Sequence, residues 1–310
     1  MNKTNELAVS LILASRNGEK KLANFFNGLD GDSVCAARAE LLLVDSASTD
    51  GSAALMTEFA ARAPFPIRVI HLEIPGQARA QNAAAAKALG ALLAFTDDDC
   101  RLDPDYFKIL ARDFDLQRHH YGGGAVVLGD PADDPRMANT SSWHFTEPMQ
   151  IPPRSLLPAG LLHGANLVFR KDVFHRLGCF DEASGPGEPL VASDAELVGR
   201  ATALGFTGLL MPDLRVLHYP NRPRGSPDAD AVVRTYDRGR GSYYASLLLM
   251  GEQRVWDLWR AGIWRPLDDP QTLSQLEREF RGAADYLVRR MESQARTSHE
   301  PKDQRPHQPD

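Results

Sequence analysis

Residues 91–100 read ALLAFTDDDC, a short apolar run that ends in three consecutive aspartates, Asp97, Asp98 and Asp99. An apolar run of this length between polar residues is typical of a buried strand. Strands that are apolar on both faces belong to parallel sheets that helices cover on each side. The stretch therefore predicts a central strand of an α/β fold, with the aspartates at its carboxyl end.

The rest of the chain repeats this pattern on both sides of residues 91–100. Further strands are expected at residues 7–15, 40–45, 67–72, 124–128, 164–170, 206–211 and 215–219. Helices are expected at residues 19–28, 52–63, 78–89, 104–116, 171–177 and 194–204. The alternation predicts a Rossmann-like, mainly parallel central sheet flanked by helices.

Three segments depart from the alternation. Residues 129–162 are rich in Pro, Asp and Ser and have no clear period, which is typical of a binding loop or a lid. Residues 229–264 and 271–291 have helical period, so a C-terminal helical extension is expected. The segment from Gln294 onward lacks large apolar residues and is expected to be disordered.

Composition argues against several classes of protein. The 310 residues include 41 acidic and 35 basic side chains, and the formal net charge of -6 argues against a nucleic-acid binder with a basic surface. Three cysteines without a C-x-x-C motif imply neither a disulfide framework nor a cysteine-rich zinc site. No apolar run reaches the roughly 18 residues that span a bilayer, and the N-terminus lacks the features of a signal peptide. A cytoplasmic protein is expected.

The three aspartates are the strongest local signal of chemistry. In an open parallel sheet the carboxyl ends of the strands face the ligand crevice. Adjacent carboxylates repel one another unless a cation compensates their charge. Asp97 and Asp99 can present oxygen ligands to Mg2+ or Mn2+, which are hard ions that share phosphates with a substrate. The alternative is a solvated acidic turn before the next helix.

Four other residues have contexts that suit a nucleotide site. Asp45 ends the second strand, so it can accept a hydrogen bond from a base or a ribose. Arg79 lies in the first turn of an alanine-rich helix and either reaches a diphosphate or lies on the surface. Asp194 opens a helix as a cap or a general base. His218 ends a strand and is either packed or a metal ligand.

A family resemblance rests on the order of these motifs. SLILASRN, VDSASTDGS, GQARAQNAAA, FTDDDC, GANLVFRKDVFHRLGCFDE, SDAELVGRATALG and RVLHYP together resemble the large family 2 of nucleotide-sugar glycosyltransferases, which have the GT-A fold. The resemblance covers roughly residues 7–250. It implies transfer of a sugar from a nucleoside diphosphate donor to an acceptor hydroxyl, usually with inversion, and a bound Mn2+ or Mg2+. A UDP-sugar is the default donor.

The resemblance also implies a division of the chain and a role for each site residue. Residues 1–128 would bind the nucleotide sugar, residues 129–225 would bind the acceptor and hold the base, residues 226–293 would be a helical region, and residues 294–310 a disordered tail. On the donor side it places Ser15, Arg16, Asp45, Arg79, Asp97 and Asp98. Asp99, Asp97 and His218 would contact the metal, with Asp99 its direct ligand, and Asp194 would be the catalytic base.

Departures from the family pattern leave alternatives open. Ser193 stands where a Glu usually precedes the base, and Gln81 stands where many members have Arg. A relative that binds sugar nucleotides but is catalytically impaired is therefore one alternative. A nucleotidyltransferase is another, although that class of enzyme is expected to have a Gly-rich loop after the first strand, where this chain has only one Gly. The acceptor is expected to be a saccharide, a lipid-linked sugar or a small molecule.

Two further expectations concern the acceptor and the membrane. Trp143, His144 and His163 are candidates for contact with the acceptor sugar. Short apolar, Trp-bearing stretches after Ala229 suit peripheral contact with the inner face of a membrane, although packing under the catalytic domain is the plainer interpretation.

Overall fold

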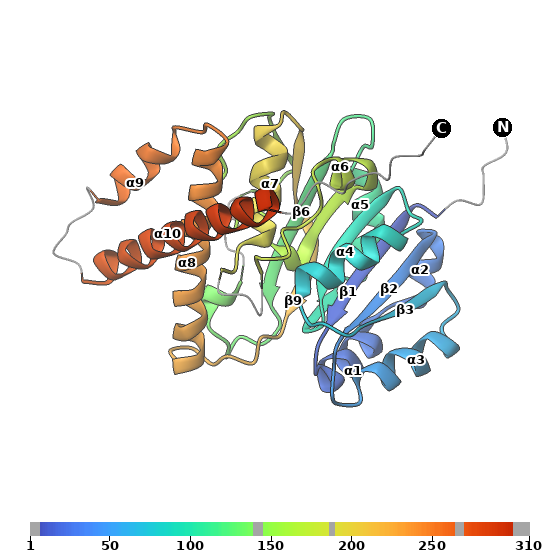
Figure 1. Ribbon diagram of the computed structural model, residues 1–310. Helices are drawn as coiled ribbons and strands as arrows, with labels where there is room; N and C mark the ends of the chain where they lie inside the picture. Colours follow the sequence, from blue (N-terminus) through green and yellow to red (C-terminus); the bar gives the residue numbers. More distant parts are fainter. Residues whose placement is uncertain (1–6, 139–144, 186–189, 264–269, 300–310) are drawn as a thin grey trace, which may run out of the picture.

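The computed structural model describes residues 7–138, 145–185, 190–263 and 270–299. Its centre is a nine-stranded sheet with helices on both faces (Figure 1). The strands are β1 Val9–Ser15, β2 Ala39–Ser46, β3 Ile67–Leu72, β4 Leu92–Asp97, β5 Cys100–Leu102, β6 Tyr121–Leu128, β7 Met149–Ile151, β8 Leu167–Arg170 and β9 Gly208–His218. Their order is β3-β2-β1-β4-β8-β6-β9-β5, and β7 pairs with β9 outside this series. The expected α/β fold is confirmed.

The helices follow the strands as the sequence pattern predicts, except that the short helix at Gly31–Ala36 was not expected. They are α1 Glu19–Gly28, α2 Gly31–Ala36, α3 Ser52–Arg62, α4 Gln77–Lys87, α5 Tyr106–Asp113, α6 Lys171–Arg176, α7 Ser193–Ala203, α8 Pro227–Leu249, α9 Val255–Ile263 and α10 Pro270–His299. Two short 3-10 helices cover Pro135–Met137 and Gly164–Asn166. None of the helices in the described part of the chain combines the length and the apolar character needed to cross a bilayer.

The order of the strands positions the site. From β1 the chain moves outward through β2 and β3, all parallel, and then crosses back to add β4 on the other side of β1. Ala14 on β1 pairs with Asp97 on β4 at this reversal. A reversal of strand order opens a crevice outside the carboxyl ends of the two strands, where open α/β sheets bind ligands. The fold therefore directs Asp97 into that crevice.

Alternation along β1 divides the core between the two faces of the sheet. Leu11 and Leu13 point to one face and pack in the cluster that includes Phe25 of α1, whereas Ile12 points to the other face among the alanines of α4. Each of these β1 side chains is at most 1% exposed. Burial of an aliphatic side chain of this size contributes about 2 kcal/mol to stability. The apolar run of β1 is continuous because both of its faces are covered.

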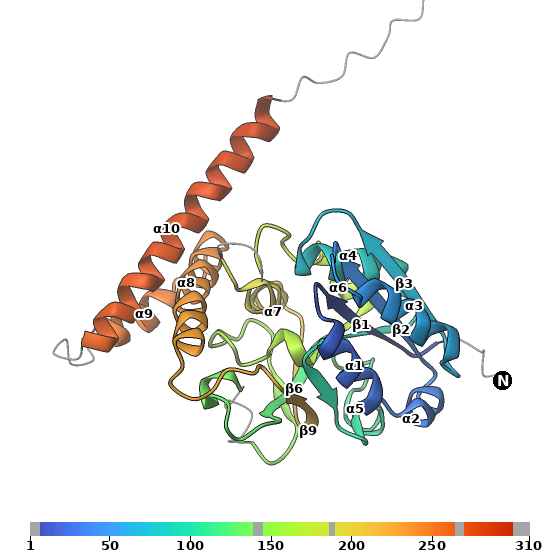
Figure 2. The ribbon, with the colours of Figure 1, turned by 90° about the horizontal axis from the view of Figure 1, so that it is seen from below.

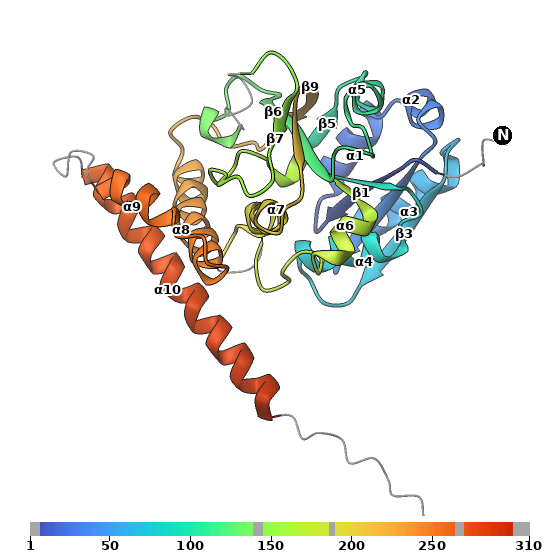
Figure 3. The same cartoon turned by 90° about the horizontal axis from the view of Figure 1, so that it is seen from above.

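The C-terminal helices form a third layer beside the sheet. Helices α8 and α10 cross at close range, and a separate apolar cluster joins them to α9. This cluster includes Tyr243, Tyr244 and Leu247 of α8, Trp259 of α9, and Ala283 and Tyr286 of α10. Figures 2 and 3 show that α10 runs past the end of α8, so that its C-terminal half extends away from the sheet.

Four expectations about the elements need correction. Residues 206–211 and 215–219 were expected as two strands but form one, β9, because the register between β6 and β9 shifts between Gly124 and Ala125 and absorbs the intervening residues. The helical region 229–264 breaks into α8 and α9 at Gly251, which has a φ of 87°. The expected disorder from Gln294 is wrong for residues 294–299, because α10 continues to His299. Strands β5 and β7, of three residues each, were not expected.

Candidate active site

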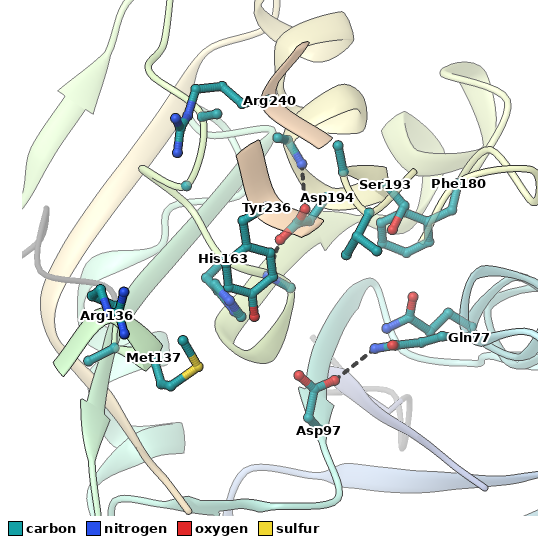
Figure 4. A pocket seen from close by; sticks show the side chains of 18 residues that line it. Gln77, Asp97, Arg136, Met137, His163, Phe180, Ser193, Asp194, Tyr236 and Arg240 are labelled. Carbon is teal, nitrogen blue, oxygen red and sulfur yellow. Dashed lines mark hydrogen bonds between the residues drawn. The ribbon is translucent and has the colours of Figure 1, made fainter. Parts of the chain in front are cut away.

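Two adjoining cavities open at the carboxyl ends of β1 and β4. The first, of about 510 Å³, is called the aspartate cavity and is lined by Ser15, Arg16, Lys21, Ser46, Asp97, Asp98, Asp99, His218 and Arg222 among others. The second, of about 400 Å³, is called the Asp194 cavity and is lined by Gln81, Arg136, Gly164, Phe180, Ser193, Asp194 and Arg240 among others (Figure 4). Gln77, Asp97, His163 and Tyr236 line both cavities. The two cavities therefore share one wall, with Asp97 in it.

The pairing of β5 with β9 brings His218 to the three aspartates. Asp97 ends β4, and the turn through Asp98 and Asp99 leads directly into β5. Because Cys100 pairs with His218, the histidine lies beside that turn. Its Nε2 is 3.4 Å from Oδ1 of Asp99. His218 and Asp99 therefore lie side by side, and the contact of His218 with a metal stays a prediction.

A hydrogen bond at the other ring nitrogen of His218 sets the orientation of the imidazole. Nδ1 lies 2.9 Å from the carbonyl oxygen of Met137, and since a carbonyl only accepts, Nδ1 donates. Nε2 is then the nitrogen that faces the aspartates. A histidine that ligates a metal typically donates its other N–H to a carbonyl or carboxylate in this way. The orientation of His218 therefore suits a metal ligand.

The three carboxylates cannot all be ionised without compensating positive charge. Burial, followed by the charge of Asp99, raises the pKa of Asp97 well above its usual range. Burial also works to raise the pKa of Asp99, but the hydrogen bond and charge of His218, together with Lys21, outweigh it and lower that pKa. For Asp98, burial again dominates and the pKa is raised. Opposite pKa shifts of neighbouring carboxyl groups are typical of a cluster of carboxylates that a cation would stabilise.

Three polar side chains hold the aspartates in place, and only one of them was predicted. Ser15 Oγ donates to Oδ2 of Asp98 over 2.5 Å. Gln77 Nε2 donates to Oδ1 of Asp97 over 2.9 Å. Lys21 Nζ lies 2.9 Å from Oδ2 of Asp99 and 3.4 Å from Oδ1 of Asp98. Gln77 and Lys21 were missed, although each lies in the first turns of a helix that begins at this edge of the sheet.

The donor-side predictions for Asp45, Arg16 and Arg79 have different outcomes. Asp45 lies at the same edge, in register with Ser15, but it does not line either cavity. Its Oδ1 accepts a hydrogen bond from the Ser48 N–H, and its Oδ2 is 3.5 Å from His71 Nδ1. Arg16 lines the aspartate cavity.

Arg79 points elsewhere. Its Nε is 3.5 Å from Oε2 of Glu182, and it lines neither cavity, whereas Gln77 at the start of the same helix reaches Asp97. Arg79 follows Gln77 by two residues, which rotates its side chain by about 200° around the axis of α4 and points it to the other side of the helix. The structure thus does not bring Arg79 together with the other predicted donor-side residues.

Asp194 lies in the first turn of α7 and faces the second cavity. Its Oδ2 accepts a hydrogen bond from the Gly164 N–H and its Oδ1 one from the Ala195 N–H, both over 2.8 Å. Figure 4 shows the carboxylate with His163 and Tyr236 on the same side. Two backbone donors therefore fix the orientation of the carboxylate, and each oxygen keeps a second lone pair for a substrate.

The residues around Asp194 were only partly predicted. Burial lowers the pKa of His163, and its Nδ1 accepts a hydrogen bond from the Ala165 N–H. Tyr236 of α8 was missed, although its motif YDRGRGSYY is readable in the sequence; burial and then the charge of Asp194 raise its pKa to about 12. Ser193, where the family Glu is expected, is 9% exposed and lines the cavity. Trp143 and His144 lie outside the described residues.

The donor set at the aspartates suits a hard divalent cation. Within the described ranges of the chain, no three His, Cys, Asp or Glu side chains already converge on one point as a metal site. However, carboxylate oxygens of Asp97 and Asp99 and Nε2 of His218 face one cavity, and carboxylate oxygens are the protein ligands that suit Mn2+ and Mg2+. The residues present therefore fit such an ion.

Comparison with known proteins places this geometry in a family. The sequence matches Glycosyl transferase family 2 over residues 10–178, which is more than half of the chain. It is 27% identical over 245 residues to Glycosyltransferase AglE of Haloferax volcanii, a match that covers 77% of this chain and 74% of that protein.

Solved structures share the fold. Mannosyltransferase PcManGT from Pyrobaculum calidifontis, in complex with GDP-Man and Mn2+, has a TM-score of 0.60 at 17% identity and covers 96% of this chain and 82% of that chain. TarS residues 1–349 of S. aureus, in complex with UDP, has a TM-score of 0.56 at 16% identity, with 96% and 93% covered. At these identities the similarity shows the GT-A fold alone. With the sequence match, it follows that the chain is a glycosyltransferase and belongs to glycosyl transferase family 2.

Proposed function

We propose that this chain is a metal-dependent, inverting glycosyltransferase that moves a sugar from a nucleoside diphosphate donor, with a UDP-sugar favoured, to a hydroxyl of a saccharide, lipid-linked or small-molecule acceptor. The observation that carries the proposal is the shared wall between the two cavities. Asp97 joins a cavity with three aspartates to a cavity that contains Asp194. Donor and acceptor would then meet at one wall.

The aspartate cavity suits the donor. Asp97, Asp99 and His218 would hold Mn2+ or Mg2+, which neutralises negative charge on a departing diphosphate. Ser15 and Arg16 line the same cavity, where the nucleotide would lie. UDP in TarS and GDP-Man with Mn2+ in the mannosyltransferase support a nucleotide site in this fold. Asp45 remains the candidate for contact with the base.

The Asp194 cavity suits the acceptor. The carboxylate would remove the acceptor hydroxyl proton as that oxygen attacks the anomeric carbon on the face opposite to the leaving diphosphate, which inverts the configuration there. Hydrogen bonds from the Gly164 and Ala195 N–H groups hold the carboxylate in one orientation. His163 and Tyr236 line both cavities and would contact substrate at their junction.

The replacement Asp194→Asn tests the base assignment. We expect transfer to fall by at least about 100-fold, because a lost general base typically costs that much or more, while UDP binding stays unchanged. Asp30→Asn, at the exposed N-cap of α2, is the matched control. Equal activity of Asp194→Asn and wild type would refute the assignment. A wild type that binds UDP-sugars but releases no UDP from them, with or without acceptors, would favour the impaired relative that Ser193 suggests.

Thermal shift with nucleoside diphosphates tests the donor site. A ligand that binds the folded state raises the melting temperature by mass action. We expect UDP to stabilise the protein in Mn2+, and the shift to disappear in chelator and in Asp99→Asn. GDP and dTDP, measured in parallel, decide the base. An undiminished UDP shift in chelator would contradict the metal role of Asp97 and Asp99.

We also propose that the enzyme works in the cytoplasm and touches the membrane peripherally. Along α10, five apolar side chains are at least 40% exposed: Leu273, Phe280, Leu287, Val288 and Met291. Trp256 of α9 is 52% exposed on the neighbouring helix. Amphipathic helices with such residues lie in the interface of a bilayer. Co-sedimentation with phosphatidylglycerol vesicles, lost in the double variant Phe280→Ser/Leu287→Ser, is the expected result; no binding by wild type would refute it.

A further inference from the structure

Lys21 is a basic residue that contacts the aspartates directly, and neither the family resemblance nor the proposed mechanism gives it a role. It lies in α1, and its Nζ is 2.9 Å from Oδ2 of Asp99 and 3.4 Å from Oδ1 of Asp98. Burial works to lower the pKa of Lys21, but the charges of Asp99 and Asp98 outweigh it and raise that pKa. The side chain is therefore a full positive charge inside the cavity.

This contact occupies oxygens that a metal ion would need. Oδ2 of Asp99 is taken by Lys21, and its Oδ1 faces Nε2 of His218. Oδ1 of Asp98 also faces Lys21, while its Oδ2 accepts the Ser15 hydroxyl. A divalent cation bound to Asp99 would lie within a few ångströms of the ammonium group, and like charges at that distance repel strongly. Lys21 and the metal therefore compete for the same carboxylate.

The side chain of Lys21 is exposed enough to move away from Asp99. Its side chain is 42% exposed, against 10% for the side chain of Asp99. A lysine ammonium is a compact charge on a flexible four-carbon stem, with three donors and no fixed plane. Lys21 lines the aspartate cavity together with Arg16 and Arg222. A diphosphate in that cavity would offer it new oxygen acceptors.

We propose that Lys21 is an exchangeable counter-ion: it neutralises Asp98 and Asp99 in the empty site and transfers to the diphosphate of the donor when a divalent cation takes its place. The inference rests on the proposed function. It gives Lys21 two opposite effects. The lysine weakens binding of the metal alone, and it strengthens binding of a nucleoside diphosphate when the metal is present. The exchange would couple loading of the metal to loading of the donor.

Direct binding measurements on the full chain test both effects. Free Mn2+ is measured by electron paramagnetic resonance, and UDP and GDP are titrated by calorimetry in saturating Mn2+. For Lys21→Met we expect Mn2+ affinity to rise about tenfold, because a partly exposed charge is removed beside the ion. Affinity for the better nucleoside diphosphate should fall by a similar factor. Lys21→Arg keeps the charge and should keep Mn2+ affinity close to that of wild type.

The neighbouring lysine provides the matched control. Lys20 is exposed in the same helix and carries the same charge, so Lys20→Met corrects for the change in net charge. If Lys21→Met and Lys20→Met bind Mn2+ equally, or if Lys21→Met binds the nucleoside diphosphate no more weakly than Lys20→Met, the exchange is refuted and the proposed function stands. If wild type binds no Mn2+, the metal dependence in the proposed function fails and this inference fails with it.

Discussion

Gly241 on α8 makes the close crossing with α10 possible, and replacing it with alanine should loosen the C-terminal layer. A Cβ on Gly241 would lie less than 3.0 Å from the carbonyl oxygen of Glu279, a distance that real Cβ atoms essentially never show. Gly282 on α10 makes a comparable approach to the backbone of Arg238. Because the obstacle on each side is backbone, the two helices would have to move apart.

Two opposing contributions decide whether Gly241→Ala raises or lowers the free energy of unfolding. Alanine is favoured over glycine inside a helix by about 1 kcal/mol. Overpacking of a close interface costs about 1–3 kcal/mol. Separation of the helices would also weaken the bonds that cross them, from Arg240 to Glu279 over 2.7 Å and from Arg278 to Asp237 over 2.9 Å. Hydrogen bonds between charged groups are worth about 1.5–3 kcal/mol each. We expect Gly241→Ala to lower the free energy of unfolding by roughly 2 kcal/mol.

Urea denaturation followed by tryptophan fluorescence measures the loss of stability and reports on the C-terminal helices. Three of the four tryptophans lie between residues 256 and 264, in or next to α9. Gly28→Ala is the control, because a Cβ there meets only the flexible side chain of Arg101, at 3.1 Å, and should be neutral or slightly stabilising. Arg240 lines the Asp194 cavity, so turnover with acceptor should fall while UDP binding persists. A Gly241→Ala protein as stable as wild type would refute the reasoning.

Two further predictions concern buried polar groups. Asn166 is fully buried and its Nδ2 donates to the carbonyls of Ala125 and Leu214, so Asn166→Ala should cost about 2–4 kcal/mol in urea denaturation; an unchanged midpoint would contradict this. In the metal-free protein, burial works to lower the pKa of His218 but the hydrogen bond and charge of Asp99 raise it, so protonation favours the folded state. The stabilisation relative to His218→Asn should be full below about pH 6.5, the unfolded value, and vanish as pH rises through the raised pKa. Melting temperatures between pH 5 and 9 measure it, and a difference that grows with pH would contradict it.

Local pattern was enough to predict most of the parallel half of the fold. The strand at residues 67–72 and the helix at residues 19–28 are confirmed with the expected bounds. Apolar periodicity is a local property, so burial on two faces appears directly in the order of the residues. The same reasoning located the three aspartates at the end of β4, where the reversal of strand order opens the crevice.

Pairing between distant segments was beyond the reach of local pattern. The sequence around residues 206–219 suggested two strands, yet both parts join β9, because their partner β6 tolerates a shift of register at Gly124. Strand β8 pairs antiparallel with β4 and β6, although its apolar composition resembles that of the parallel strands. Such choices depend on which edges remain free after the rest of the sheet has formed, and that information is spread over the whole chain.

The sequence by itself determined the α/β fold, the aspartates at a strand end and the family, because periodicity and the order of motifs are local. Only the tertiary structure decided which side chains meet. It brought His218 to Asp99 through the pairing of β5 with β9, and it turned Lys21 toward the aspartates and Arg79 toward Glu182. The direction of a side chain depends on how its helix is rotated about its own axis relative to the crevice. Packing of the helix on the sheet sets that rotation.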